Sequence, residues 1–156
     1  MTAVAGPSRL AAGFGPIRIG RPVLAGALAL TAALVAVYLI WAPPSGDLAA
    51  ATYRAGFFAR NGFAPYDGQW YSGGDTLGYS VLLGPLGALL GVRLLAGLSA
   101  ILAAGCFARL VDRPLPAGWF AVGVGVSLGS GRIAYTLGLG LGLAAVLAAG
   151  RRQTAA

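Results

Sequence analysis

The side chains that could do chemistry gather in one stretch, residues 46–75, of a chain that is otherwise mostly Ala, Leu, Val and Gly. Three of the four acidic residues fall there, with two of the eleven arginines and about half of the aromatic residues. The chain has no histidine, which excludes a Ser-His-Asp triad and a His-ligated zinc site. Acid–base chemistry must therefore use a tyrosine or one of the four aspartates, Asp47, Asp67, Asp75 and Asp112.

Asp47 directly follows the sequence Pro-Pro-Ser-Gly, which ends the first apolar run. A carboxylate in this place can cap a helix, which stabilises the helix by about 0.5–2 kcal/mol, and Ser45 is the other candidate for that role. It can instead act as a general base toward an acceptor hydroxyl at a membrane face. By the same reasoning, Asp67 and Asp75 are either turn residues, for which aspartate is typical, or groups that take part in the chemistry.

Cations and aromatic rings accompany these carboxylates. Guanidinium groups match phosphate oxygens in pairs, so the nearby arginines are candidates for binding a phosphate. A charge within a membrane costs roughly 2.5–3.5 kcal/mol. An arginine that interrupts an apolar run is therefore either functional or marks the end of a span. The candidates for substrate contact are Arg54, Arg60, Arg93, Arg132, Asp67, Asp75, Trp70 and Tyr71, although the two aromatic residues are also typical of interface anchors.

The composition indicates an integral membrane protein. Of the 156 residues 58% are hydrophobic and 10% are charged, against about 25% charged residues in soluble domains. The net charge of +7 comes from arginines at segment ends, which form no stripe, so we expect no binding of nucleic acid. The aspartates are too few and too irregularly spaced to predict a metal site, and no cofactor is evident.

We expect an all-α bundle with about four membrane-spanning helices, within a range of three to five. The uncharged run of 19 residues at 23–41 is long enough to span, and it ends in Tyr38 and Trp41, which are typical of an aromatic belt. The predicted segments are a tail at 1–22, a membrane module at 23–150 with spans at 23–41, 94–108, 117–131 and 133–150, an external loop at 42–76, a re-entrant or interfacial segment at 77–92, and a tail at 151–156.

The distribution of arginine predicts the orientation. Four spans place seven arginines on the side of the N-terminus and four on the other, so the positive-inside rule predicts a multi-pass cell-membrane protein with a cytoplasmic N-terminus. A cleaved signal peptide is disfavoured, because the run is long and ends in Trp-Ala-Pro-Pro instead of an Ala-x-Ala site. In the external loop, residues 48–62 predict an amphipathic helix that ends at Gly62 and lies along the membrane surface.

Two glycine pairs have the spacing of close helix contacts. Gly87 and Gly91, and likewise Gly138 and Gly142, match the small-xxx-small pattern of packed membrane helices. The Gly-rich stretches lack the G-x-G-x-x-G spacing and the strand–helix context of phosphate loops. We therefore expect these glycines to pack helices.

The order of these features resembles the N-terminal part of the GT-C superfamily of membrane glycosyltransferases, which use polyprenyl-phosphate-linked sugars. In that superfamily the first external loop begins with an acidic residue just after the first span and carries juxtamembrane helices. The stretch DTLGYSVLLGPLGALLG is similar to the region of a Pro-containing motif in many members. RLLAGLSAILAAGCFARL is similar to the R-L-x-S-A-L-type span that follows.

The resemblance implies a function and roles for the residues above. Asp47 would be the catalytic base, the arginines would hold the phosphate, and Asp67 or Asp75 would supply a second acidic position. Members are several times longer, so the resemblance covers only an N-terminal module, which would be inactive if truncated. Expected partners are membrane lipids, a polyprenyl-phosphate sugar and a further membrane protein. The alternative is a small non-enzymatic membrane subunit that uses the external loop as a contact surface.

Overall fold

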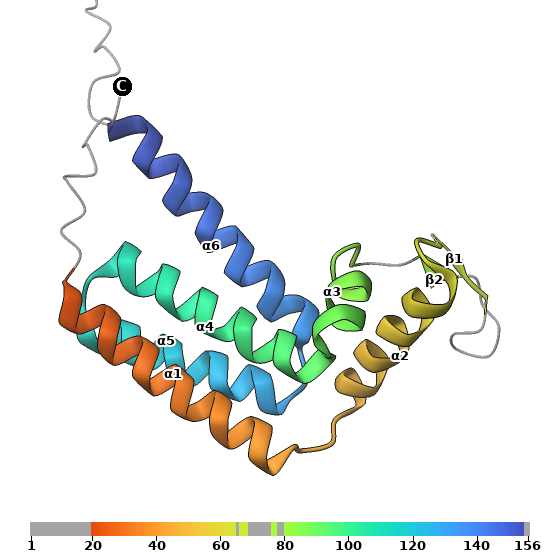
Figure 1. The fold of residues 1–156 in the computed structure, drawn as a ribbon. Helices are drawn as coiled ribbons and strands as arrows, with labels where there is room; N and C mark the ends of the chain where they lie inside the picture. Colours follow the sequence, from red (N-terminus) through yellow and green to blue (C-terminus); the bar gives the residue numbers. More distant parts are fainter. Residues whose placement is uncertain (1–19, 65, 69–75, 78–79, 155–156) are drawn as a thin grey trace, which may run out of the picture.

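The computed structural model describes residues 20–64, 66–68, 76–77 and 80–154, and its architecture is an all-α bundle, as predicted (Figure 1). One antiparallel pair of two-residue strands accompanies the helices in the described ranges, with Asp67 opposite Thr76. The elements in chain order are α1 (Arg21–Trp41), α2 (Gly46–Asn61), β1 (Tyr66–Asp67), β2 (Thr76–Leu77), α3 (Leu83–Leu90), α4 (Val92–Val111), α5 (Pro114–Gly129) and α6 (Ile133–Thr154).

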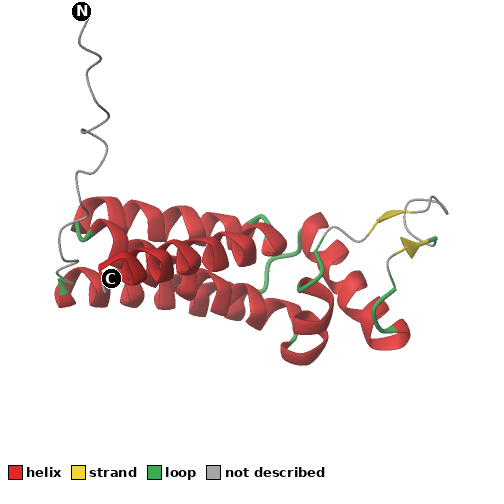
Figure 2. Ribbon diagram, turned by 90° about the horizontal axis from the view of Figure 1, so that it is seen from above, coloured by secondary structure: helices red, strands yellow, loops and turns green. Residues whose placement is uncertain are grey.

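Four helices, α1, α4, α5 and α6, form the bundle, and successive members run in opposite directions. The connections between α4 and α5 and between α5 and α6 are short, so each reverses the chain. Helix α4 is central and packs on α1, α5 and α6, while α1 also packs on α5. Figure 2 shows the bundle with α2, α3 and the strands beyond one of its ends. The polar stretch is therefore gathered at a single end of the bundle.

Three helices are long and apolar enough to cross a membrane, namely α1, α4 and residues Ile133–Arg152 of α6. They correspond to three of the four predicted spans and indicate a multi-pass membrane protein. The remaining predicted span, at 117–131, corresponds to α5, which is apolar but has only 16 residues. Its length of about 24 Å is less than the bilayer core of about 30 Å.

Some boundaries differ from those predicted. Helix α6 continues to Thr154, so residues 151–154 extend the last span and do not form a separate tail. This extension places Arg151 and Arg152 in the last turn, where cations interact favourably with the helix dipole. The predicted interfacial segment contains α3, whose eight residues measure about 12 Å and are too short to cross.

Glycines do bring the helices close, but partly at other positions than predicted. Gly140 of α6 lies against the backbone of α4, where a Cβ would be 3.1 Å from the Ser99 carbonyl oxygen. Gly138 and Gly142 were predicted to pack helices closely, yet a Cβ at either would meet nothing within 4 Å in the described part of the chain. The pair therefore makes no close contact within the described chain, because the face of α6 that meets α4 is rotated away from it.

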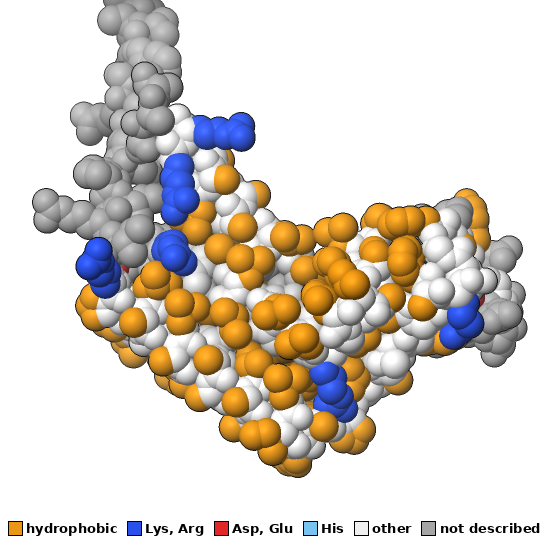
Figure 3. Space-filling view, in the orientation of Figure 1, with side chains coloured by type: hydrophobic (Ala, Val, Ile, Leu, Met, Phe, Trp, Pro, Cys, Tyr) orange, Lys and Arg blue, Asp and Glu red, His pale blue; other side chains and the backbone are white. Residues whose placement is uncertain are grey.

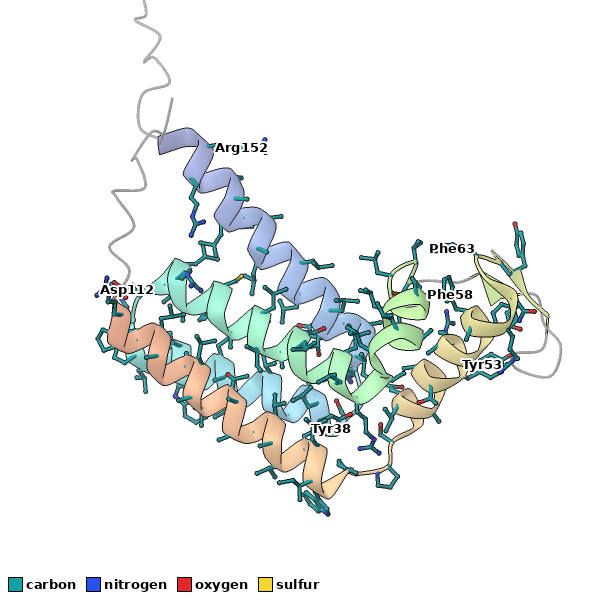
Figure 4. The ribbon with its side chains drawn as sticks, in the orientation of Figure 1. Tyr38, Tyr53, Phe58, Phe63, Asp112 and Arg152 are labelled. Atoms are coloured by element: carbon teal, nitrogen blue, oxygen red, sulfur yellow. The ribbon has the colours of Figure 1, made fainter. Side chains whose placement is uncertain are left out.

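Asp112 has a structural role at the end of the bundle opposite to α2 (Figure 4). It ends α4 in the left-handed conformation, with φ 47°, and its Oδ1 accepts a hydrogen bond of 2.9 Å from the Gly20 backbone N–H. Gly20 is the residue before α1, so this carboxylate satisfies a free donor and lies at the positive end of the α1 dipole. The contact joins the start of α1 to the end of α4, 92 residues away in the sequence.

Candidate functional site

The first turn of α2 packs directly against the turn between α5 and α6. The Ser45 Oγ accepts a hydrogen bond of 3.2 Å from the Leu48 backbone N–H and so caps α2. Gly131 in the opposing turn has φ +77°, and a Cβ there would lie 2.8 Å from the Leu48 nitrogen and overlap the Ser45 Oγ. Only glycine fits this approach, which fixes the start of α2 on the bundle.

Asp47 lies within this contact region but is not the cap. Of the two candidates, Ser45 accepts the capping hydrogen bond, and the Asp47 side chain is exposed in the first turn of the helix. The N-terminal end of a helix dipole stabilises a nearby negative charge. Asp47 is therefore an accessible carboxylate in a helical turn, where a substrate hydroxyl can come within hydrogen-bond reach of it.

Arg132 lies on the facing side of the same contact. It directly follows Gly131, its side chain is exposed, and its carbonyl oxygen accepts hydrogen bonds from the Thr136 backbone N–H at 3.0 Å and Oγ1 at 2.9 Å. Those bonds anchor its backbone to the first turn of α6. The contact between Gly131 and the Ser45–Leu48 turn thus brings together the two segments that carry Asp47 and Arg132.

Arg93, at the start of α4, holds the connection between α1 and α2. Its Nη2 donates to the Ala42 carbonyl oxygen at 2.9 Å and is 3.4 Å from that of Pro43. Its guanidinium carbon lies 5.7 Å from the centroid of the Tyr38 ring. A cation here satisfies carbonyls at the C-terminal end of α1 and positions the chain that leads to Asp47.

Tyr38 is not the lipid-facing belt residue that the sequence predicted. Its side chain is only 5% exposed and packs in the core, whereas Trp41, three residues later, is 78% exposed as a belt residue should be. The Tyr38 hydroxyl and the Arg93 Nη1 are both buried, and neither has a hydrogen-bond partner among the described residues. Figure 4 shows Tyr38 near the end of α1 that leads to α2.

A second polar group lies farther along α2. The Tyr53 hydroxyl donates a hydrogen bond of 3.1 Å to the Asp67 Oδ1, which joins α2 to β1. Burial raises the pKa of the Tyr53 hydroxyl above its usual 10.0, the hydrogen bond and charge of Asp67 raise it further, and Arg60 opposes the rise. Tyr53 therefore remains protonated and donates this bond at neutral pH.

The structure thus divides the predicted site residues into two groups. Asp47, Arg93 and Arg132 belong to the junction at the end of the bundle, and Arg60 and Asp67 belong to the group around Tyr53. Arg54 is half-buried between them, two turns or about 10 Å along α2 from Asp47, so it does not adjoin that carboxylate. The remaining candidates, Asp75, Trp70 and Tyr71, lie outside the described residues.

Sequence reasoning missed Tyr53 and the role of Tyr38. Tyr53 was one of several tyrosines that could take part in acid–base chemistry, and only the fold brings it to Asp67, 14 residues away. In the described part of the chain, no group of three His, Cys, Asp or Glu side chains could hold a metal ion. The arrangement can supply a base, cations and aromatic surface.

Comparisons with known proteins found no match to a protein-family model, to a curated protein or to a solved structure. The function therefore has to be inferred from the chemistry of the chain's own residues. Three features carry that inference: the membrane-spanning bundle, the accessible carboxylate at its end, and the arginines on the adjoining segments.

Proposed function

We propose that the chain is the N-terminal module of a GT-C-like membrane glycosyltransferase, which transfers a sugar from a polyprenyl-phosphate donor at the outer membrane face. The observation that supports this most is the packing of the first turn of α2 on the α5–α6 turn, seen at Gly131. That contact places the segment of Asp47 beside the segment of Arg132, at an end of membrane-spanning helices where a lipid phosphate would lie.

In this proposal Asp47 is the general base. Its carboxylate accepts the proton of the acceptor hydroxyl while the hydroxyl oxygen forms a bond to the anomeric carbon of the donor sugar. The bond from that carbon to the phosphate oxygen breaks, and the electron pair leaves with the polyprenyl phosphate. Arg132 binds the phosphate, whose charge grows as it leaves, and Arg93 acts as a positioning residue through the carbonyls of Ala42 and Pro43.

The second polar group suits the binding of the acceptor. Arg60, Asp67 and the half-buried Arg54 lie farther from the bundle on α2 and β1. Together with Asp75, Trp70 and Tyr71 of the same loop, they would offer hydrogen bonds and flat apolar surface to a sugar or other hydroxylated acceptor. Donor and acceptor would then meet at the first turn of α2.

The proposal requires that α2 lies outside the cell and that the N-terminus is cytoplasmic. In a Cys106→Ala background, cysteines introduced at Arg60 and Arg132 should react in intact cells with a membrane-impermeant maleimide. A cysteine at Arg113, at the other end of the bundle, should react only after the membrane is made permeable. Reaction at position 113 in intact cells would contradict the orientation.

Binding of the donor tests the function even if further domains are needed for transfer. The full chain in liposomes should be labelled by a photoreactive polyprenyl-phosphate sugar, and Arg132→Gln should lower that labelling by about 10-fold, because a charged hydrogen bond contributes roughly 1.5–3 kcal/mol. Arg60→Gln removes another exposed arginine from the group proposed to bind the acceptor and should leave labelling by the donor nearly unchanged. Equal labelling of the wild type and Arg132→Gln would contradict the proposed phosphate site.

A second function, a non-enzymatic membrane subunit, is supported by one face of α6. Gly138, Leu141, Gly142 and Val146 are exposed there and are not covered by the described part of the chain. Small residues on an exposed membrane helix are suited to packing on a helix of another protein. If donor labelling is absent and a membrane protein co-purifies in fixed proportion, this second function is the better one.

A further inference from the structure

The end of the bundle opposite to α2 is strongly basic. It comprises the start of α1, the end of α4, the start of α5 and the end of α6. Figure 3 shows arginine side chains gathered toward this end of the molecule. Its described arginines are Arg21, Arg109, Arg113, Arg151 and Arg152.

The acidic residue at this end is already engaged. Asp112 is the one acid among the described residues there, and its carboxylate accepts the hydrogen bond from Gly20 at the start of α1. Five guanidinium groups against one carboxylate leave a large excess of positive charge. This excess of positive charge attracts anionic groups, most strongly at low ionic strength.

Two of these arginines continue the stripe along which α4 and α6 pack. On α6, Gly140 contacts the α4 backbone, Leu147 is buried, and Arg151 follows Leu147 by four residues and thus lies on the same face. On α4, Leu102 lies 3.3 Å from the position of a Gly140 Cβ, and Arg109 follows Leu102 by seven residues. By this spacing, both arginines lie on the stripes of their helices that continue the α4–α6 contact.

The side chain of Arg109 is held against its own helix. Its Nη1 donates to the Gly105 carbonyl oxygen at 3.3 Å, so its guanidinium lies back along α4 by about one turn.

We propose that Arg109 and Arg151 together bind the phosphate of an anionic phospholipid, with an acyl chain along the seam between α4 and α6. The lipid source is favoured over free phosphate because the arginines terminate apolar, membrane-spanning helices and so lie at the headgroup level. Leu102, which is 38% exposed beside Gly140, provides apolar surface for the chain. This site lies at the opposite end from Asp47 and does not depend on the proposed transfer reaction.

Titration of the detergent-purified full chain with dioctanoyl phosphatidylglycerol, followed by native mass spectrometry, tests the proposal. The double variant Arg109→Gln, Arg151→Gln should bind roughly 30-fold more weakly than the wild type, from about fivefold for each arginine. Arg152→Gln is the matched control, because it removes the same charge from the same turn of α6 but from another face. It should bind no more than about fivefold more weakly than the wild type, the general surface attraction of one charge.

Each result distinguishes the defined site from its alternatives. Unchanged binding by the double variant, with an unchanged melting temperature, would overturn the proposal. An equal loss in Arg152→Gln would also overturn it, because the attraction would then be diffuse. Inorganic phosphate at the lipid concentration should not displace phosphatidylglycerol, and displacement by it would show that the site takes free phosphate.

Discussion

Replacing Asp47 with Asn should lower sugar transfer from a polyprenyl-phosphate donor by about 100-fold or more, because the side chain can no longer accept the acceptor's proton. The change should appear in kcat, with the KM for the donor nearly unchanged, since Asp47 is proposed to act on the acceptor in the transition state. Transfer of radiolabelled sugar in membranes that contain the variant as the sole copy measures both quantities.

The substitution of Asp47 should affect the proposed chemistry with little effect on the stability of the fold. Ser45, and not Asp47, caps α2, and the Asp47 side chain is exposed, so Asn should alter stability by no more than about 1 kcal/mol. Ser45→Ala is the matched control: it weakens the cap but keeps the carboxylate, and should retain most of the transfer activity. Unchanged transfer in Asp47→Asn would remove Asp47 from the mechanism.

Replacing Gly131 with Ala should destabilise the docking of α2 on the bundle by about 2–5 kcal/mol. Part of this cost, about 1–3 kcal/mol, comes from the positive φ of +77°, which L residues rarely adopt. The remainder comes from the overlap of the new Cβ with the Ser45 Oγ and the Leu48 nitrogen, which forces the two segments apart. Denaturant unfolding in detergent, together with proteolysis within α2, measures the loss.

Gly129→Ala provides the control for this prediction. Gly129 ends α5 two residues earlier, and a Cβ there would meet nothing within 4 Å. Because alanine is favoured over glycine in a helix, this change should be neutral or stabilising by up to about 1 kcal/mol. If both alanine variants unfold alike, the Gly131 contact does not hold α2 in place.

The helices themselves could be predicted because their signals are local. Hydropathy alone identifies α1, α4 and α6, since a run of apolar residues must be removed from water wherever its neighbours lie. The bounds of α2 also follow from local chemistry: Ser45 caps its start, and Gly62, with φ +66°, ends it as predicted. Asp47 could be singled out for the same reason, from its place after Pro43 and Pro44.

The contacts that assemble the site depend on how each helix is rotated, and spacing does not determine that rotation. Gly138, Gly140 and Gly142 are equally small and lie on the same helix. Only the packing of the helices shows that Gly140 is the one that meets α4. Tyr38 is typical of an aromatic belt by position, but the α1 face that carries it turns toward α4. The approach of Gly131 to Ser45 joins segments 86 residues apart, beyond the reach of any local pattern.

The side chain of Arg93 has a mechanical consequence. Helices α2 and α3 pack mainly on each other and are joined to the bundle by two short connections, one at Ala42 and Pro43 and one at Gly91, with φ +81°. Arg93 lies two residues after Gly91 and donates hydrogen bonds to the carbonyl oxygens of Ala42 and Pro43, so its side chain links the two connections. Any movement of the α2–α3 unit relative to the bundle that separates Arg93 from Ala42 and Pro43 must stretch or break these bonds, so Arg93 restrains such movement.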